Sequence, residues 1–461
     1  MNQSQNNHTA KLTFFGGTGE VTGANFHVET RQGIFLVDCG MVQGGDEAEG
    51  KNWEDFGYDP SQVDVLFITH SHQDHIGRIP KLVRDGFRGK IYSTQVTKEL
   101  SDIMLHDALG IMMQDAEKSG REPLYEEQDI THALALWKSV PYHNVTEFLP
   151  GWTFEFKDAG HVLGSSMVYI VHNNKSILFT GDLGNSPNLL LRDVEPVASV
   201  DYIVMESVYG DRNHDERTER SKILERAIED IAERKGVLMI PAFSLERTQE
   251  LLFELNSFIE HGRVPKIDVY LDSPLAIKVT DIYRKHAESF NDTTRDLINK
   301  GDDVFDFPRL TFTETVDESK GINNARVPKI VIAGSGMMNG GRIVHHAMQY
   351  LPDKNNIILF VGYQAVGTLG SIIQGGARHV NIFGNDVPIK AEVRTISGYS
   401  GHAGSDELVA FIDGCKHSVK KVFCAMGDPK SSMFLAQRLR DHLGVHASAP
   451  DQGDVVEFDF S

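Results

Sequence analysis

The chain has 461 residues, of which 40% are hydrophobic, and it carries a formal net charge of −20 at pH 7. This length exceeds a single typical core and predicts a soluble protein of two domains. Because Lys and Arg form no block in this acidic chain, the sequence argues against a broad basic surface that binds duplex nucleic acid nonspecifically. Any nucleic acid should therefore be held locally, in a cleft.

The cysteines and the apolar runs indicate a compartment. Cys39, Cys415 and Cys424 are odd in number and lack the spacing of metal ligands, which fits a reducing cytoplasm without a disulfide framework. Residues 1–10 are polar and rich in Asn, and they predict a disordered N-terminal arm rather than a signal peptide. No apolar run is long enough to span a bilayer, so we expect no membrane contact.

Taken in chain order, the first part of the sequence alternates short strand-like runs with turns and a few helices. Strand-like runs include residues 12–15, 33–37 and 65–68. A turn at Asn173 and Asn174 should join two strands as a hairpin.

The pattern changes after residue 206. Helical stretches at 217–235, 246–261 and 342–350 alternate with apolar runs at 236–241 and 329–333. This alternation predicts βαβ units with a parallel sheet, as an inserted domain. The Gly- and Asn-rich residues 375–386 should be a return linker, after which a strand at 422–425 and a helix at 433–443 rejoin the first domain.

Residues 69–75 read Thr-His-Ser-His-Gln-Asp-His and follow an apolar run. His70 and His72 lie two apart, so an extended segment presents both on one face, while Asp74 and His75 fall on the turn before a helix. Imidazole and carboxylate ligands suit zinc, with manganese or iron as alternatives, and the cluster can serve two neighbouring ions.

Further ligands stand at the ends of later apolar runs. His161 lies in a turn-rich segment, and Asp182 follows the run 175–179. His161 can join His70 and His72 on one ion, and a carboxylate at 182 is placed to bridge two cations. Asp38 ends another strand-like run, where we expect it to hold a ligand histidine from behind.

These residues resemble the metallo-β-lactamase superfamily, whose His-x-His-x-Asp-His signature is matched by residues 70–75. Glu206, the stretch 240–249 and His402 narrow the resemblance to the β-CASP branch of RNA- and DNA-processing nucleases, which includes RNase J and the endonuclease of pre-mRNA 3′-end cleavage. The resemblance covers nearly the whole chain from about residue 11.

The resemblance implies a fold and a domain organisation. The fold class is α/β: a metallo-β-lactamase αββα sandwich with an inserted β-CASP α/β domain, a parallel sheet flanked by helices. The metallo-β-lactamase domain should comprise residues 11–206 and 381–461, and the insert residues 207–380.

It also implies an activity. We expect metal-dependent hydrolysis of RNA phosphodiester bonds, endonucleolytic or 5′–3′ exonucleolytic, by a metal-activated water in a cleft between the two domains. The metal ligands are His70, His72, Asp74, His75, His161 and Asp182, holding two Zn²⁺ with Mn²⁺ as an alternative. Asp74 and Asp182 also act in catalysis, and His402 is the general acid, held protonated and oriented by Glu206.

One position departs from the family's pattern. Met426 stands where the family carries a histidine for the ion that Asp74 and His75 serve, and a thioether is a poor ligand for zinc or manganese. Two interpretations stay open. Either Met426 is a packing residue beside a retained site, with Asp428 as a substitute ligand to consider, or the second ion is weakly held and the enzyme works with one tight metal or is partly disabled.

A Gly-rich segment, residues 333–342, runs into a helix and could hold a phosphate on backbone N–H groups, although a plain strand-to-helix turn explains it equally well. The residues that we expect to contact RNA or its phosphates are Ser244, Arg247, Ser273, Ser335, Arg342, His345 and Ser400. Five of them each follow a strand-like run, where each could instead be a cap or a surface residue: Ser244, Arg247, Ser273, Arg342 and His345.

Two other functions compete. The same metal cluster serves hydrolases of small esters, thioesters and lactams, although an insert of this size speaks against a small substrate. The second alternative is an RNA-binding paralogue with weakened catalysis, which Met426 alone supports. For the partner we expect single-stranded RNA more than duplex, with DNA and a homodimer left open.

Overall fold

The computed structural model describes residues 9–44, 49–214, 217–362, 364–365, 367–396 and 398–460. The chain forms two compact units, the first made of Met1–Asn213 with His402–Ser461 and the second of His214–Gly401. The predicted disordered arm, residues 1–10, lies outside the described residues up to residue 8, and Thr9 and Ala10 already belong to a strand. In the described ranges, no helix has the length and apolar content needed to cross a membrane.

The first unit contains two seven-stranded sheets. The first sheet has the order β22-β1-β2-β3-β4-β5-β6, antiparallel from β22 to β3 and parallel from β3 to β6. Its strands are β1 (Thr9–Gly16), β2 (Asn25–Glu29), β3 (Ile34–Val37), β4 (Val65–Phe67), β5 (Lys90–Ser93), β6 (Trp137–Ser139) and β22 (Val455–Asp459).

The second sheet has the order β21-β20-β11-β10-β9-β8-β7. It is antiparallel from β7 to β10 and parallel from β10 to β21. Its strands are β7 (Thr146–Leu149), β8 (Trp152–Asp158), β9 (Ser166–His172), β10 (Lys175–Phe179), β11 (Tyr202–Glu206), β20 (Lys421–Ala425) and β21 (Ala447–Ser448).

Strand alternation explains how the two sheets stack. In β3, Phe35 and Val37 join the cluster that also contains Phe179 and Phe423 of the other sheet, whereas Leu36 joins an outer cluster. Successive side chains of a strand leave opposite faces, so one face of each sheet meets the other sheet and the second face is covered by helices. This gives four layers, helices–sheet–sheet–helices.

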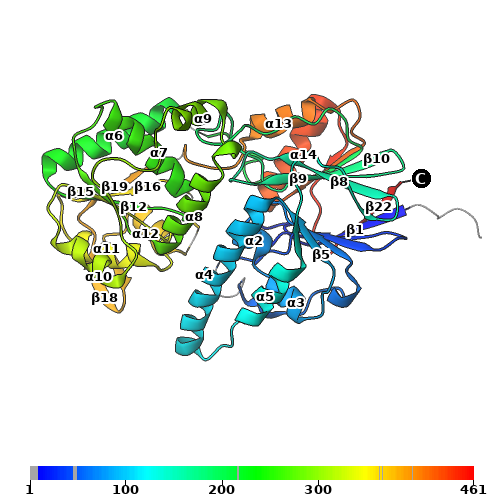
Figure 1. The fold of residues 1–461 in the computed structure, drawn as a ribbon, viewed down its shortest axis with the longest axis horizontal. Coiled ribbons are helices and arrows are strands. Elements are labelled where there is room, and N and C mark those ends of the chain that lie inside the picture. Colours follow the sequence, from blue (N-terminus) through cyan, green and yellow to red (C-terminus); the bar gives the residue numbers. More distant parts are fainter. Residues whose placement is uncertain are drawn as a thin grey trace, which may run out of the picture. The chain divides into compact units, whose positions relative to one another are not determined.

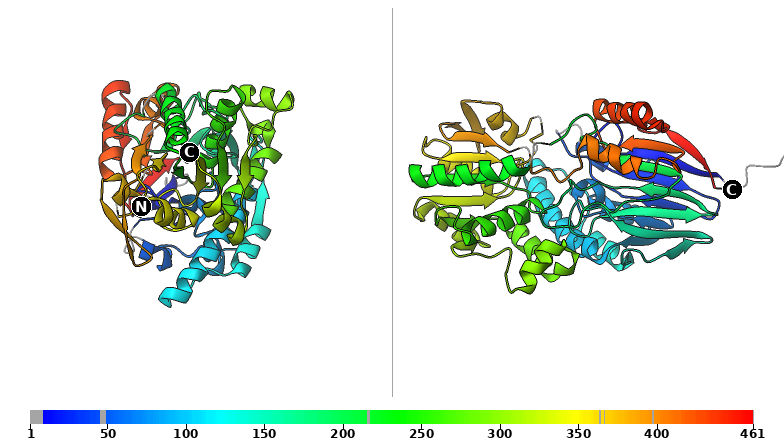
Figure 2. Two further views of the ribbon diagram at one scale, coloured as in Figure 1. Left: turned by 90° about the vertical axis from the view of Figure 1, so that its left-hand side faces the viewer. Right: turned by 90° about the horizontal axis from the view of Figure 1, so that it is seen from above.

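Different segments supply the two helical layers, which Figures 1 and 2 show on the outer faces. The first sheet is covered by helices from the N-terminal part: α2 (Gln73–Ile76), α3 (Ile79–Arg84), α4 (Gln95–Ser119) and α5 (Glu127–Leu136), with 3-10 turns at Lys51–Trp53 and Pro60–Gln62. The second sheet is covered by α13 (Ser405–Asp413) and α14 (Pro429–Leu443).

The second unit contains a six-stranded sheet of the order β14-β13-β15-β12-β16-β19 in which every neighbouring pair is parallel. Its strands are β12 (Val237–Pro241), β13 (Asp268–Leu271), β14 (Leu310–Phe312), β15 (Lys329–Ala333), β16 (Ile357–Phe360) and β19 (Glu392–Thr395).

Helices lie on both sides of this sheet, α6 on one and α11 on the other (Figure 1). They are α6 (Arg217–Arg234), α7 (Arg247–Glu260), α8 (Pro274–Lys285), α9 (Asp292–Asn299), α10 (Val316–Gly321), α11 (Arg342–Tyr350) and α12 (Leu369–Gln374), with 3-10 turns at Ala287–Ser289 and Ile322–Asn324. The two units together confirm the predicted α/β class, with parallel strands flanked by helices.

The predicted return linker at residues 375–386 is wrong. Residues there form a hairpin of β17 (His379–Ile382) and β18 (Asn385–Pro388), and β19 then pairs in parallel with β16 in the inserted sheet. The second unit therefore continues to Gly401, past residue 380 where the sequence placed its end. Gly and Asn mark the hairpin turn as readily as a linker, since both tolerate positive φ.

Candidate metal centre

The His-x-His-x-Asp-His segment starts at His70, shortly after the wholly buried strand β4. His72 is the N-cap of α2, so Asp74 and His75 lie in the first turn of that helix. The backbone here rests on a neighbouring turn, where a Cβ built on Gly40 would come within 1.5 Å of the carbonyl oxygen of Asp74. Only glycine fits at position 40 without moving the ligand helix.

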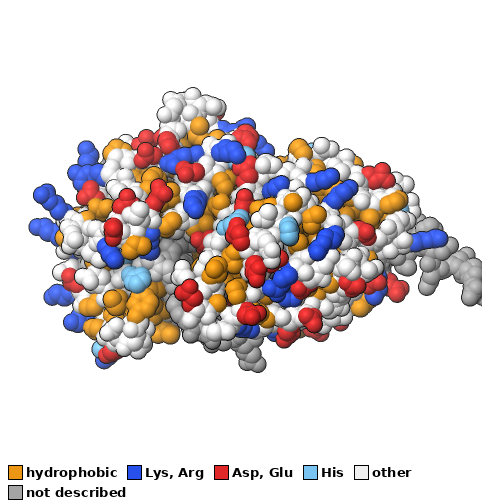
Figure 3. Space-filling view, turned by 60° about the horizontal axis from the view of Figure 1, so that its bottom comes forward, with side chains coloured by type: hydrophobic (Ala, Val, Ile, Leu, Met, Phe, Trp, Pro, Cys, Tyr) orange, Lys and Arg blue, Asp and Glu red, His pale blue; other side chains and the backbone are white. Residues whose placement is uncertain are grey.

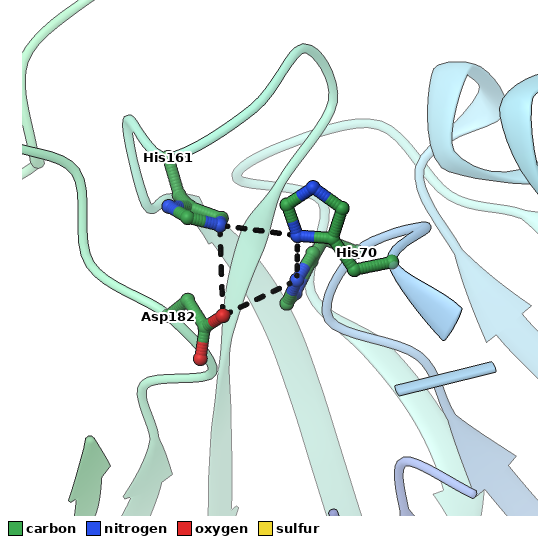
Figure 4. Close-up of side chains that lie close together, drawn as sticks. His70, His161 and Asp182 are labelled. Atoms are coloured by element: carbon green, nitrogen blue, oxygen red, sulfur yellow. Dashed lines mark hydrogen bonds and ion pairs between the residues drawn. The ribbon is translucent and has the colours of Figure 1, made fainter. Parts of the chain in front are cut away.

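Four side chains converge on one point (Figure 4). Ligand atoms of His70, His72, His161 and Asp182 all lie within 4.8 Å of one another. His70 Nε2 is 3.0 Å from His72 Nδ1, and His161 Nε2 is 3.3 Å from the same atom. Asp182 Oδ2 lies 3.4 Å from His70 Nε2 and 3.5 Å from His161 Nε2.

These distances fit a metal ion. Four ligands at the ordinary zinc distances of about 2.0–2.1 Å stand roughly 3.3 Å apart at the corners of a tetrahedron. Three imidazoles and a carboxylate are also a donor set that zinc accepts, and manganese or iron can take it too. The four residues therefore fit a divalent ion.

The other carboxylate oxygen of Asp182 faces His75, at a second position where a cation could bind. Its Oδ1 lies 3.4 Å from His75 Nε2, and His75 Nε2 lies 3.9 Å from Asp74 Oδ2. Asp182 Oδ1 and His75 Nε2 are both buried and have no hydrogen-bond partner among the described residues. Buried polar atoms are normally satisfied, so this pair indicates a position for a cation.

Asp38 holds His75 from behind. His75 Nδ1 donates to Asp38 Oδ2 at 2.7 Å, which points Nε2 toward the centre. Thr69 fixes the carboxylate in turn, because its backbone N–H donates to Asp38 Oδ1 and its hydroxyl donates to Oδ2. The sequence pointed to Asp38 but not to Thr69, whose only signal is that it precedes His70.

Burial and the crowded charges shift several pKa values. Burial, together with the charge of His75, lowers the pKa of His70 well below its usual value, so His70 is neutral, as a metal ligand must be. Burial alone would lower the pKa of His75, but the carboxylates of Asp182, Asp38 and Asp74 raise it well above. Burial raises the pKa of Asp74 to about 6. A cation arriving at His75 therefore displaces a proton.

Glu206 and His402 form a pair beside the cluster. His402 Nδ1 lies 3.3 Å from Glu206 Oε1, and the same oxygen accepts from the backbone N–H of Leu183 at 2.6 Å. The His402 ring also stands 4.7 Å from the His161 ring, centroid to centroid. Burial would lower the pKa of His402, but Glu206 and Asp182 outweigh it and raise the pKa to about 9. The two carboxylates therefore favour the protonated form of His402.

Met426 lies at the end of the next strand. It follows β20, whose last residue, Ala425, is in register with Glu206 of β11. Its side chain is 2% exposed and belongs to the apolar cluster between the two sheets. A Cβ on Gly17 would meet its sulfur at 2.5 Å, so the thioether packs against Gly17.

In the second unit, two serines stand close together. Ser244 follows β12, Ser273 is the N-cap of α8, and their hydroxyl oxygens lie 3.3 Å apart. A Cβ on Gly334, at the start of the Gly-rich turn, would lie 3.6 Å from each. Ser335, in the same turn, donates its hydroxyl to Gly340 O at 3.3 Å.

The two arginines are engaged elsewhere. Arg342 donates to Asp272 at 2.7 Å and to the carbonyls of Thr313 and Glu314. Arg247 is buried and pairs with Glu250. These contacts indicate structural roles, which the sequence could not show because the partner of Arg342 is 70 positions away.

The last two residues expected to contact RNA are His345 and Ser400. His345 packs against Phe383 with ring centroids 4.7 Å apart, and Ser400 is half-buried. A further residue of interest, which the sequence did not indicate, is Phe243, which is 38% exposed and lies where a side chain at Gly336 would have to go. An aromatic residue directly before Ser244 was the available signal.

The stacked sheets with a His/Asp centre at their strand ends define a metal-dependent hydrolase of the metallo-β-lactamase fold. Family models match three successive segments: the metallo-beta-lactamase superfamily at residues 20–242, the Beta-Casp domain at 248–373 and the Zn-dependent metallo-hydrolase RNA specificity domain at 386–450. The chain belongs to the β-CASP family of the metallo-β-lactamase superfamily.

Curated relatives match most of the chain. It is 37% identical over 405 residues to "Ribonuclease TTHA0252" of Thermus thermophilus, covering 88% of this chain and 91% of the relative. It is 30% identical to an "RNase J-like protein" of Methanocaldococcus jannaschii (96% and 99% covered) and 30% identical to "Transcription termination factor FttA" of Methanosarcina mazei (95% and 70% covered).

A solved structure shares the fold. A protein of unknown function from Enterococcus faecalis V583 superposes with a TM-score of 0.56 at 12% identity, covering 98% of this chain and all of that chain. At this identity the likeness concerns the fold alone.

Proposed function

We propose that this chain is a zinc-dependent ribonuclease that hydrolyses phosphodiester bonds of single-stranded RNA. The observation that carries the proposal is the His402–Glu206 pair beside the metal ligands, because a protonated imidazole with a carboxylate behind it is a general acid for a departing oxygen. The names of the relatives, two of them ribonucleases, support RNA as the substrate.

A bound metal ion and the protein's own side chains would supply different parts of the hydrolysis. When bound, a divalent ion acts as a Lewis acid that activates water and neutralises charge on the phosphoryl oxygens. His70, His72, His161 and Asp182 would hold it, and Asp38 orients the His75 ring so that Nε2 faces the centre. His402 donates its proton to the leaving oxygen, and Glu206 stabilises the cationic ring until that transfer.

The second unit has its own groups that suit RNA. Ser244 and Ser273 offer hydroxyls to a phosphate near the turn at Gly334, and the exposed ring of Phe243 offers a face on which a base stacks. On the face drawn in Figure 3, described Lys and Arg side chains are interspersed with Asp and Glu. Recognition by a few placed groups suits this surface better than a broad electrostatic grip.

The test is cleavage of a 5′-labelled single-stranded RNA by zinc- or manganese-loaded protein. We expect cleavage that is lost on chelation and in Asp182→Asn, but kept in Asp292→Asn, where an exposed carboxylate is removed instead. Undiminished cleavage by Asp182→Asn overturns the proposal.

Parallel substrates separate the alternatives. Duplex RNA, single-stranded DNA, a thioester and a β-lactam are offered to the same preparation, and we expect slower turnover of each. Faster turnover of the thioester or β-lactam identifies a small-molecule hydrolase instead. A cytoplasmic location belongs to the same proposal, because the three cysteines are buried and unpaired.

A further inference from the structure

The His-x-His-x-Asp-His residues face two places for a metal ion, and the second place has fewer ligands than the first. Among the described residues, the carboxylate, thiol and imidazole groups that converge closely enough to hold an ion are His70, His72, His161 and Asp182 in one set and Asp182, Glu206 and His402 in another. Asp74 and His75 belong to neither set, although His75 Nε2 is buried without a hydrogen-bond partner. The second position is therefore provided for, but incompletely.

The strand order shows where another ligand would come from. β10, β11 and β20 are neighbouring parallel strands, so their carboxyl ends lie along one edge of the sheet. Asp182 follows the first, Glu206 ends the second, and Met426 follows the third. Met426 is thus the next residue along the edge that already carries Asp182 and Glu206.

Met426 is also tied to the backbone beneath Asp74. Its N–H donates to Gly17 O at 2.6 Å, and a Cβ on Gly17 would lie 3.2 Å from Ala24 Cα. Ala24 N–H in turn donates to Asp74 O at 2.9 Å. Backbone hydrogen bonds thus link residue 426 to the turn that carries Asp74, and its side chain adds an apolar thioether to the cluster between the sheets.

We propose that this chain binds one divalent ion tightly, on His70, His72, His161 and Asp182, and a second only weakly, at Asp74, His75 and the shared carboxylate of Asp182. The second ion has two ligands of its own, and Met426 adds none because a thioether binds zinc and manganese poorly. The weak position fills only when free metal is abundant. The inference uses the metal centre of the proposed function but not its substrate.

The experiment measures the number of metal ions bound per chain in the absence of RNA. Metal-free protein is incubated with excess Zn²⁺, gel-filtered and analysed for zinc per chain by mass spectrometry. We expect the wild type to retain about one ion, Met426→His to retain about two, and Met426→Leu, the matched control that adds no ligand, to retain about one. Retention of two ions by the wild type, or of one by Met426→His, overturns the proposal.

A second pair of variants keeps the test decisive if Met426→His does not fold. Asp74→Asn removes a ligand of the weak position alone and should leave the retained ion in place, whereas His72→Ala removes a ligand of the tight position and should lose it. Loss of the tightly held ion from Asp74→Asn overturns the proposal. Since no RNA is present, a protein that fails to cut RNA still gives a metal count.

Discussion

His402 and Glu206 are 196 positions apart in the chain, and His402 Nδ1 lies 3.3 Å from Glu206 Oε1. His402 reaches this place because Ala403 N–H donates to Leu183 O, which lays the returning chain along the loop after Asp182. The contact couples the charge of the imidazole to a carboxylate that is itself fixed by Leu183.

The first prediction concerns the acid. His402→Ala should lower kcat for RNA cleavage by about 10²–10⁴-fold, the usual worth of a positioned general acid, and should leave RNA affinity and the tightly held metal ion unchanged. Single-turnover kinetics and a binding assay on one preparation measure both. Cleavage at the wild-type rate would remove His402 from the mechanism.

The pH dependence follows from the same pair. The pKa of His402 is raised to about 9, so the acid form is present below that pH and the rate falls as the pH rises through it. Glu206→Gln removes one of the charges that raise this pKa, and the fall should begin at a lower pH. The measurement is kcat/KM against pH at fixed free metal. An alkaline limb that does not move contradicts the assignment of Glu206.

A substitution at Gly40 tests the close packing of this residue against α2, the helix that carries Asp74 and His75. Gly40→Ala places a Cβ within 1.5 Å of Asp74 O, so the turn or α2 must shift. We expect a destabilisation of about 2 kcal/mol or more with loss of bound metal.

The control for this substitution is Gly110→Ala in α4, where a Cβ meets nothing within 4 Å. It should stabilise the protein by roughly 0.5–1 kcal/mol. Urea unfolding followed by Trp fluorescence reports on this unit, because Trp53, Trp137 and Trp152 all belong to it. If Gly40→Ala unfolds at the same urea concentration as the wild type, the prediction is wrong.

Asp272 gives a stability prediction for the second unit. It is fully buried and accepts from Arg342, His346, Thr313 and Ser319. Burial would raise the pKa of this carboxyl, but these donors lower it from 3.8 to about 2. The folded-state value lies below the unfolded one, so the contribution, about 2 kcal/mol, is present above pH 4 and lost as the pH falls toward 2.

Calorimetry from pH 5 to pH 2.5 tests this. Asp272→Asn should melt lower than the wild type at pH 5, and the difference should shrink at pH 2.5. Asp292→Asn, an exposed carboxylate of the same unit, is the control and should change little at either pH. A difference that is constant across the range would show that the carboxylate charge is not what matters.

The phosphate contact can be tested on the serine pair. Removing both hydroxyls in Ser244→Ala/Ser273→Ala should weaken RNA binding by about 10-fold or more, since a hydrogen bond to a charged group contributes roughly 1.5–3 kcal/mol. Metal content should stay the same. Ser257→Ala, on α7 of the same unit, is the matched control. Equal affinities for the two variants would place the phosphate elsewhere.

The sequence predicted that several of the candidate ligands would lie together, because each has a local signal. His70, His161 and Asp182 each follow a strand, and strand ends of one edge meet whatever the intervening length. The role of Arg342 was beyond such reasoning, since a buried partner 70 positions away decides it. The hairpin at β17 and β18 was missed because its Gly and Asn residues are equally typical of a linker. β19, which pairs with β16, carries no signal that distinguishes an inserted strand from a strand of the first unit.

The two-sheet origin of the ligands has a consequence for folding. His70 and His72 follow a strand of the first sheet, while His161 and Asp182 stand among strands of the second. Neither sheet alone supplies all four ligands, so an intermediate with formed strands but unpacked sheets should bind metal more weakly than the native protein. Retention of a divalent ion should therefore report native packing in this unit, and by mass action the ion should stabilise the assembled state that binds it best.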